Sequence, residues 1–315
     1  MLKIYGSLTL MIIMWSFSFI IVDIGIEFIT PLSLAFYRFI IASAAFAIID
    51  LFVFLKRRHY SDISNKKKEN FSFNKESLLS LIVASLSGIS LFFLSQYLAI
   101  ELIGPSLPAL FVCLLAPIII SVFALIFFNE RLTKMKILGI IIATVGSFFL
   151  ITGGNIANIL PSSPNFVGNI LALITPLLWA IYSTISKYLI KKSSSIKINK
   201  YISYFGLIEL FLFVLISNEI GSFFLNFTNI IVFFCALYLG LGSYVIGYYI
   251  WQYSQTKLNS LKVASFLYVE PFLTLIFSFL LSRNEVIVFG NIIGGFIVLI
   301  AVIIINYERE IKKVG

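Results

Sequence analysis

Long apolar segments alternate with short polar ones along almost the whole chain. Each apolar segment holds about 19–25 residues, enough for a helix to cross ~30 Å of hydrocarbon at 1.5 Å per residue. Inside lipid the backbone polar groups must bond within the segment, so the pattern predicts an all-α polytopic membrane protein with ten transmembrane helices. The ten segments cover residues 4–22, 31–55, 78–98, 105–127, 135–153, 167–190, 201–219, 229–251, 260–282 and 286–307.

The 23 Lys and Arg residues are concentrated in alternate connections. If the amino terminus lies in the cytoplasm, all of them except Arg38, Lys187 and Arg283 fall on the cytoplasmic side or flank it. Cytoplasmic loops of membrane proteins carry an excess of positive charge, so both termini are predicted to be cytoplasmic. The most basic connection, residues 56–77, is interpreted as a charged cytoplasmic loop.

Composition favours a multi-pass protein of the plasma membrane over a soluble protein. Hydrophobic residues make up 60% of the chain and charged residues 12%, and the mean hydropathy is +1.04, outside the range of soluble domains. The net charge of +9 would otherwise suggest a nucleic-acid partner. Its placement in alternate loops instead indicates topology, with some attraction to anionic lipid. We therefore expect membrane lipid as a partner and no nucleic acid.

The two halves of the chain repeat each other. The matched pairs are Trp15 with Trp179, Pro117 with Pro271, Glu130 with Glu285, and Gly139 with Gly294. Each half holds five apolar segments, an odd number, so the second half enters the membrane with the opposite orientation. The sequence thus predicts two inverted five-helix repeats, over 4–153 and 167–307. Such repeats are typical of secondary transporters, whose halves enclose a site at the membrane midplane.

The residues that carry the repeat also point to a known family. The first copy holds Trp15, Pro31, Arg38, Pro117, Asn129-Glu130-Arg131-Leu132 and Gly139; the second holds Gly168, Trp179-Ala180-Ile181-Tyr182, Lys187, Pro271, Glu285 and Gly294. Their order, spacing and duplication resemble the EamA-type repeat of the drug/metabolite transporter superfamily, over about 4–152 and 167–306. The resemblance implies ten helices around a central cavity. It also implies transport of small metabolites, such as amino acids or drugs, driven by an ion or substrate gradient and not by ATP.

Three ionisable residues within the apolar segments are candidates for binding a substrate or a coupling proton: Glu270, Arg38 and Glu209. Charged groups are costly in lipid, so their presence there indicates function by default. Glu270 is the leading candidate because Pro271 follows it, and a proline removes a backbone donor and opens the helix beside this carboxylate. A structural ion pair between Glu270 and Arg38 is the alternative interpretation.

Aromatic and amide side chains form a second set of candidates for a substrate cavity. The set comprises Trp15, Gln96, Tyr97, Trp179, Tyr182, Tyr248 and Tyr268. Such side chains suit an amphipathic organic solute, because rings hold its apolar body and a few polar groups fix its orientation. Tyr and Trp also gather at the lipid interface. Depth along the segment favours that alternative for Trp251, Gln252 and Gln255.

Other residues are interpreted structurally. Glu130 is expected to cap the helix that follows it, because the helix dipole favours a carboxylate near the amino terminus. Gly290 and Gly294 allow close helix packing, within one protomer or between two, so a homodimer is left open. The only histidine, His59, lies in the charged loop, and no phosphate-binding loop motif occurs. We therefore expect no metal site, no cofactor and no direct use of ATP.

These observations predict a secondary transporter, not an enzyme, that moves a small organic metabolite out of the cell by alternating access. The first, third, fourth, sixth, eighth and ninth apolar segments are expected to line the cavity. Glu270 and Arg38 would bind substrate charges or the coupling proton, and Trp15, Trp179 and Tyr182 would hold the apolar body. Two alternatives remain open: an uncoupled facilitator or exchanger, and a membrane-embedded enzyme or sensor.

Overall fold

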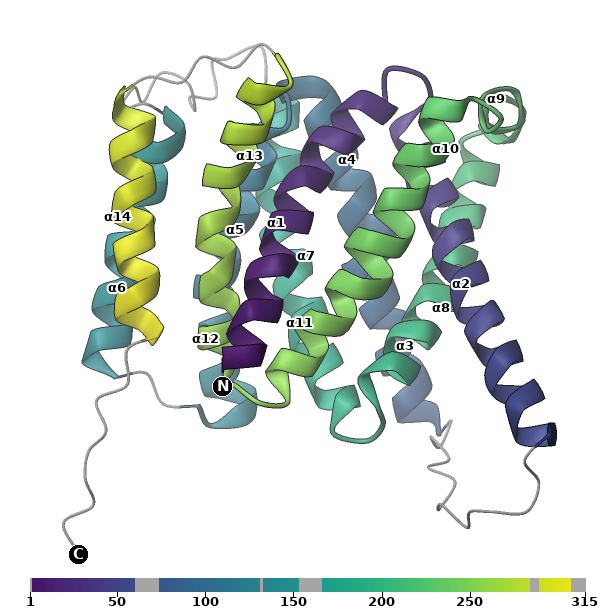
Figure 1. Cartoon of the computed structure of the whole chain (residues 1–315), viewed down its shortest axis with the longest axis horizontal. Helices are drawn as coiled ribbons and strands as arrows, with labels where there is room; N and C mark the ends of the chain where they lie inside the picture. Colours follow the sequence, from purple (N-terminus) through teal and green to yellow (C-terminus); the bar gives the residue numbers. More distant parts are fainter. Residues whose placement is uncertain (1, 60–73, 131–132, 153–165, 284–288, 307–315) are drawn as a thin grey trace, which may run out of the picture.

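The chain folds into a bundle of helices, and most of the helix axes are roughly aligned with one another (Figure 1). The computed structural model describes residues 2–59, 74–130, 133–152, 166–283 and 289–306, and the regular elements within them are all helical. Most of the predicted charged loop at 56–77 lies outside the described residues. So do the connection 153–165, Arg131, Leu132 and Glu285.

The helices of the two halves follow the apolar segments of the sequence. The first half contains α1 (Leu2–Gly25), α2 (Pro31–His59), α3 (Lys75–Ser85), η1 (Leu86–Ser90), α4 (Leu91–Ile103), α5 (Ser106–Phe128) and α6 (Lys134–Thr152). The second half contains α7 (Phe166–Ile190), α8 (Ser195–Ile216), α9 (Ile220–Asn226), α10 (Ile230–Leu237), η3 (Tyr238–Ile246), α11 (Gly247–Gln255), α12 (Ser260–Ala264), η4 (Ser265–Val269), α13 (Glu270–Leu280) and α14 (Phe289–Asn306).

Eight helical stretches among the described residues are long and apolar enough to cross a membrane. Some are composite: α3, η1 and α4 form one stretch, α10, η3 and α11 another, and α12, η4 and α13 a third. These eight coincide with eight of the ten predicted segments and make the chain a polytopic α-helical membrane protein. The other two predicted segments coincide with α6 and α14, which pack along each other at one edge of the bundle (Figure 1).

Helices of the first half pack mainly against helices of the second. The helix α2 contacts α8, and α6 contacts α14, so each pairs with the segment at the same place in the other half. In addition, α1 contacts α13 while α5 contacts α7, which joins the first segment of each half to the fourth segment of the other. The contacts therefore have the two-fold character expected of a duplicated unit.

The third apolar segment of each half contains a π-helical stretch, η1 in the first half and η3 in the second. Stretches of π-helix are rare and shift the backbone hydrogen-bond pattern away from the regular α ladder. In both stretches a backbone carbonyl accepts from a distant side chain. Tyr248 Oη donates to Gly88 O at 2.9 Å, and Trp15 Nε1 donates to Ser243 O at 2.8 Å. The irregular backbone is therefore tied to aromatic residues from other helices.

The first and last described helices have their chain-terminal ends on the same face of the bundle (Figure 1). The start of α1, the end of α14 and the connection between α7 and α8 lie at the lower face in this view. The end of α1, the short helix α9 and the start of α14 lie at the upper face. We refer to these faces as lower and upper below.

Candidate functional site

A pocket lies between the two halves of the bundle, and its wall contains five of the predicted site residues. Trp15 comes from α1, Gln96 from α4, Trp179 from α7, Tyr248 from α11 and Glu270 from α13. The helix α5 also contributes to the wall. The pocket thus draws on the first, third, fourth, sixth, eighth and ninth apolar segments, which are the segments that the sequence predicts around the cavity.

Glu270 stands where the ninth apolar segment changes its helical form. The 3-10 stretch η4 ends at the residue before it, and α13 begins at Glu270 with Pro271 in its first turn. Proline has no N–H to donate and fits best at the start of a helix, so its position accounts for the change from 3-10 to α-helix. The backbone stays helical through Glu270, so the helix changes its form beside this carboxylate without opening.

The carboxylate of Glu270 is buried and weakly held. The residue is 3% exposed, and Cys113 Sγ on α5 donates to one of its carboxylate oxygens at 3.3 Å. A thiol is a weak hydrogen-bond donor, and no cation forms an ion pair with Glu270 among the described residues. The group is therefore free to take a proton or to bind a cation that enters the pocket.

Six of the side chains that line the pocket are aromatic. This aromatic wall consists of Trp15, Phe19, Phe92, Phe93, Trp179 and Tyr248. The rings of Trp15 and Trp179 are nearly perpendicular, at 89°, with centroids 5.3 Å apart. Tyr248 lies 5.3 Å from Trp179, and Phe92 lies 5.4 Å from it. These separations lie within the range of favourable aromatic contacts, so the rings hold each other in place.

The two tryptophans that correspond in the repeats differ in their hydrogen bonding. Trp15 Nε1 donates to the carbonyl oxygen of Ser243 in η3. Trp179 Nε1 is buried and has no hydrogen-bond partner within the described part of the chain. Buried polar groups are usually paired, so this unpaired donor is a departure that the bundle must tolerate in this conformation.

Arg38 lies behind the aromatic wall and does not pair with Glu270. Its Nη1 donates to Tyr97 Oη at 2.5 Å and its Nη2 donates to Leu239 O in η3 at 2.8 Å. Its guanidinium carbon lies 4.0 Å from the ring centroid of Phe93, which itself lines the pocket. The ion pair between Arg38 and Glu270 that the sequence offers as an alternative is therefore wrong. Arg38 and Tyr97 instead support the wall from outside.

The remaining predicted residues also lie outside the pocket wall. Tyr182 Oη accepts from Gln252 Nε2 at 2.9 Å, and its ring lies 5.1 Å from that of Trp179. Tyr268 packs in a separate apolar cluster with residues of α6 and α14. Glu209 on α8 accepts from two serine hydroxyls near η1 and is only half-buried. The structure brings none of these three to the pocket.

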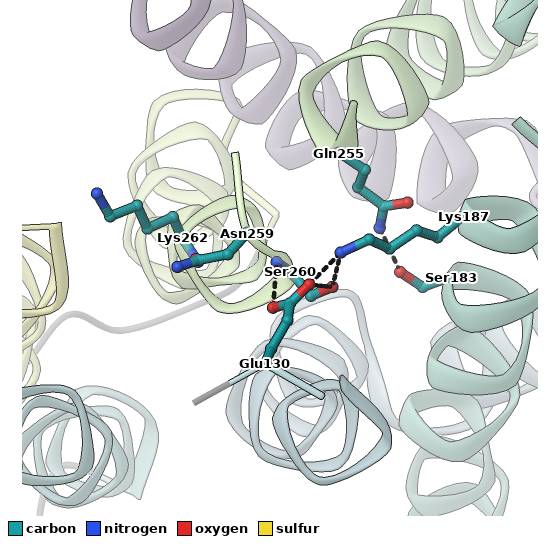
Figure 2. Close-up of polar contacts among 7 residues, drawn as sticks. All are labelled: Glu130, Ser183, Lys187, Gln255, Asn259, Ser260 and Lys262. Atoms are coloured by element: carbon teal, nitrogen blue, oxygen red, sulfur yellow. Dashed lines mark hydrogen bonds and ion pairs between the residues drawn. The ribbon is translucent and has the colours of Figure 1, made fainter. Parts of the chain in front are cut away.

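A polar cluster joins helices near the end of α7, and Figure 2 shows its side chains. The Lys187 ammonium at the end of α7 forms an ion pair with Glu130, which follows α5, and donates to Ser260 Oγ at 2.7 Å. Glu130 accepts in turn from the backbone N–H of Ser260 at 2.9 Å. We call Glu130, Lys187 and Ser260 the lower closure. It joins the fourth and sixth apolar segments to the ninth.

Two sequence interpretations near this cluster are wrong. Glu130 does not cap the helix that follows it; its carboxylate accepts from Ser260, the first residue of α12 in the other half. Thr133 accepts from Lys136 N at the start of α6 instead. Gln255 does not lie at the lipid interface, because it is 4% exposed and donates to Ser183 Oγ at 2.7 Å. The neighbouring residues 251–252 are fully buried as well.

At the upper face a second set of charged residues joins α1 to the residues that follow α13. Arg283 Nε donates to Asp23 Oδ2 at 2.6 Å, and its Nη2 donates to Glu27 Oε1 at 2.5 Å. We call Asp23, Glu27 and Arg283 the upper closure. Partial burial by itself lowers the pKa of Arg283, but the hydrogen bonds and charges of Asp23 and Glu27 outweigh burial and raise its pKa above the ordinary value.

The structure adds lining residues that the sequence alone did not identify as candidates. Phe92 and Phe93 belong to the aromatic wall, and Ser18 and Ser243 contribute hydroxyls to the lining. The chain contains 33 phenylalanines, so composition offered no means to select these two. Ser18 lies one turn after Trp15, and that helical spacing is the signal that would have identified it.

Comparison with known proteins agrees with this geometry. The model of the EamA-like transporter family matches residues 3–152 and 166–307. The chain is similar to an uncharacterized transporter of Archaeoglobus fulgidus, 27% identical over 308 residues, covering 98% of this chain and 99% of that protein. It is also similar to the uncharacterized transporter YyaM of Bacillus subtilis, 24% identical over 288 residues, covering 91% and 88%.

A solved structure shows the same fold. A crystal structure superposes on this chain with a TM-score of 0.67 and covers 96% of both chains. The two sequences are 17% identical, so this likeness concerns the fold alone. The match over the full length supports an arrangement in which the two halves of the chain meet around the pocket.

Proposed function

Because the chain belongs to the EamA-like transporter family, with both halves matched, we propose that it is a secondary active transporter of a small organic solute. In this proposal the ten apolar segments all span the plasma membrane as two inverted five-helix repeats, with both termini in the cytoplasm. The single observation that carries the proposal is the pocket between the halves, with a buried carboxylate where a spanning stretch changes from 3-10 to α-helix. Transporters built from inverted repeats typically bind their solute near the midplane, between the repeats.

The packing of the helices supports the inverted repeat. The first segment of each half contacts the fourth of the other, and the third segment of each half carries a π-helical stretch. The positive charge of alternate loops supports a cytoplasmic lower face, on which α1 begins and α14 ends (Figure 1). An odd number of segments per half then gives the second half the opposite orientation.

Alternating access follows if the two closures open in turn. The lower closure holds Lys187 to Glu130 and Ser260, and the upper closure holds Arg283 to Asp23 and Glu27. Opening the lower closure gives the pocket access to the cytoplasm, and opening the upper closure gives access to the outside. In this mechanism the solute crosses because the two closures open one after the other. The two never open together, so no continuous channel forms.

The test is the accessibility of a pocket residue from both sides of the membrane. We expect a cysteine at Ser18, in a C113S/C235A background, to react with a membrane-impermeant thiol reagent from either side. Ile196, exposed near the start of α8, and Ser282, exposed after α13, serve as one-sided controls when replaced by cysteine. Labelling of Ser18→Cys from one side only would overturn alternating access. Labelling of the two controls from the same side would overturn the topology.

Energy coupling has its own test. An imposed pH gradient that drives the solute against its concentration gradient in proteoliposomes identifies proton coupling. Flux that only follows the solute gradient identifies a facilitator or exchanger. We propose proton coupling, because Glu270 is the one carboxylate of the described pocket lining and lacks a strong partner. Glu270→Gln is expected to abolish gradient-driven accumulation.

A further inference from the structure

The described lining of the pocket carries one formal charge. Glu270 supplies a carboxylate, and the other lining residues are aromatic, aliphatic, amide or hydroxyl side chains. Cys113 offers this carboxylate only a weak thiol donor. A buried charge without a counter-charge is unfavourable, so a cation that enters the pocket gains the attraction of Glu270.

The buried basic side chain of Arg38 does not line the pocket. Arg38 directs its guanidinium to Tyr97 Oη and to Leu239 O, and it lies over the ring of Phe93. It is 1% exposed and is not part of the pocket lining. An anionic solute in the pocket would therefore meet the ring of Phe93 and not the charge behind it.

The aromatic wall attracts positive charge, as Glu270 does. The face of an aromatic ring attracts a cation within about 6 Å of its centroid, and tryptophan does so best. Trp15, Trp179 and Tyr248 lie within 5.8 Å of one another, centroid to centroid, and all three line the pocket. Rings that are mutually packed are pre-organised and need little ordering when a ligand binds.

We infer that the transported solute is an organic monocation, an amine or quaternary ammonium on an aromatic or other flat apolar body. Its charge lies toward Glu270 and its body lies against the aromatic wall. This inference rests on the proposed transport function and specifies the substrate class of the same pocket. A free amino acid with the same body adds a carboxylate, for which the described lining offers neutral donors such as Gln96 and Ser18 but no cation.

The test compares ligands that share a body and differ in charge. Binding to purified protein in nanodiscs is followed by isothermal titration calorimetry, because indole ligands fluoresce in the same band as the lining residues Trp15 and Trp179. The ligands are 2-phenylethylamine, 2-phenylethanol, phenylalanine and 3-phenylpropionate, with tryptamine and tryptophan as a larger pair. We expect each amine to bind at least about tenfold more tightly than the alcohol, amino acid or carboxylate of its series. Only the amine brings a positive charge to Glu270 without also bringing a carboxylate that finds no cation in the described lining.

Variants separate the carboxylate from general loss of structure. Glu270→Gln is expected to remove the preference for amines, whereas Glu270→Asp keeps it in weaker form. Glu219→Gln is the matched control, because Glu219 is a carboxylate that accepts from Ser33 at 2.9 Å near the upper face, outside the pocket. If Glu270→Gln fails to fold, the charge series on the unaltered protein still decides. Equal or tighter binding of phenylalanine or 3-phenylpropionate, or no binding of either amine, overturns the inference.

Failure of this inference is distinct from failure of the proposed function. Two-sided labelling of Ser18→Cys requires no ligand. Two-sided labelling without a preference for amines overturns the substrate class and keeps the transporter. One-sided labelling together with a preference for amines overturns transport and keeps the chemistry of the pocket.

Discussion

The indole nitrogen of Trp15 lies 2.8 Å from the carbonyl oxygen of Ser243, so a side chain of α1 is hydrogen-bonded to the π-helical stretch η3 of the other half. Trp179 is the residue that the sequence pattern matches to Trp15, and its indole nitrogen has no hydrogen-bond partner among the described residues. The two halves therefore occupy different local states around the same pocket. Exchange of these states between halves is what a pair of inverted repeats needs to open first to one side and then to the other.

Replacing each tryptophan by phenylalanine tests this difference. Both changes shorten a buried ring, but only Trp15→Phe removes a hydrogen bond and leaves the Ser243 carbonyl without this donor. A net protein hydrogen bond contributes about 1 kcal/mol. We expect Trp15→Phe to lower the melting temperature of the purified protein more than Trp179→Phe. Equal losses would show that the bond to Ser243 adds nothing to stability.

Two glycines beside the pocket are predicted to resist substitution. A Cβ at Gly88 in η1 would lie 2.2 Å from the ring of Tyr182, and a Cβ at Gly247 would lie 2.3 Å from Trp15 Nε1. Overpacking of this kind costs about 1–3 kcal/mol. We expect Gly88→Ala and Gly247→Ala to reduce both thermal stability and uptake into proteoliposomes.

Gly6 provides the control for this prediction. It lies in α1, and a Cβ there would meet nothing within 4 Å. Alanine is favoured over glycine in a helix by about 1 kcal/mol, so Gly6→Ala should leave stability unchanged or slightly increased. Destabilisation by Gly6→Ala as large as that by Gly88→Ala would contradict the steric explanation.

Removing the Lys187 ammonium is predicted to open the lower face. The pair with Glu130 is mostly buried, and loss of one partner of a buried pair costs about 3–5 kcal/mol. In a cysteine-free background, Lys187→Met should therefore increase the rate at which a cysteine at Ser183 reacts with an impermeant reagent from the lower side. Ser183 is 1% exposed, so its labelling reports opening.

Lys192→Met is the matched control for this change. Lys192 also forms an ion pair, with Glu76, but both side chains are well exposed, and exposed pairs contribute little. Labelling at Ser183 should remain at the level of the unaltered protein. A comparable increase in both variants would mean that loss of positive charge, and not loss of the lower closure, causes the exposure.

The upper closure should be insensitive to pH over the neutral and mildly alkaline range. The hydrogen bonds and charges of Asp23 and Glu27 raise the pKa of Arg283 above its ordinary value. A group with a raised pKa stabilises the folded state fully below its unfolded pKa and loses this contribution only as the pH rises through the folded pKa. Arg283→Gln should therefore lower the melting temperature by the same amount at pH 7 and at pH 9. A loss present at pH 7 and absent at pH 9 would contradict full protonation of Arg283.

Glu209 is predicted to act on stability and not on the pocket. Its carboxylate accepts from Ser85 Oγ at 2.6 Å and Ser90 Oγ at 2.5 Å; Ser85 ends α3 and Ser90 ends η1. Alanine offers no acceptor, so Glu209→Ala loses both bonds, at a cost of about 1–3 kcal/mol. We expect a lower melting temperature with amine affinity retained. Loss of amine affinity with an unchanged melting temperature would instead indicate that Glu209 takes part in binding the solute.

The sequence was sufficient to predict which apolar segments surround the pocket, because segment length and the repeat are visible in the order of residues. Trp15, Trp179 and Glu270 were predicted as site residues and lie in the pocket wall. Glu270 could be singled out because Pro271 follows it, and a proline has a direct effect on the helix.

The partners of the charged residues could not be predicted, because they depend on three-dimensional register. Arg38 finds Leu239 O, an acceptor that is available where η3 departs from the α-helical pattern. Glu130 finds Ser260, which is 130 residues away in the chain. Neither contact has a local sequence signal. The local sequence favoured Glu130 as a cap of the following helix. That interpretation was wrong because Lys187 and Ser260 of the other half donate to its carboxylate.

The lower and upper closures also bear on how an electric field would act on the protein. Lys187 and Glu130 carry opposite charges at one end, and Arg283 is paired with Asp23 and Glu27 at the other, so each end keeps its own counter-ions. A membrane potential does work only on charge that moves through it, about 2.3 kcal/mol per elementary charge per 100 mV. If the ions of each end stay at that end while it opens in the proposed cycle, none of them crosses the field. Voltage dependence of the flux would then report the charges carried through the pocket itself.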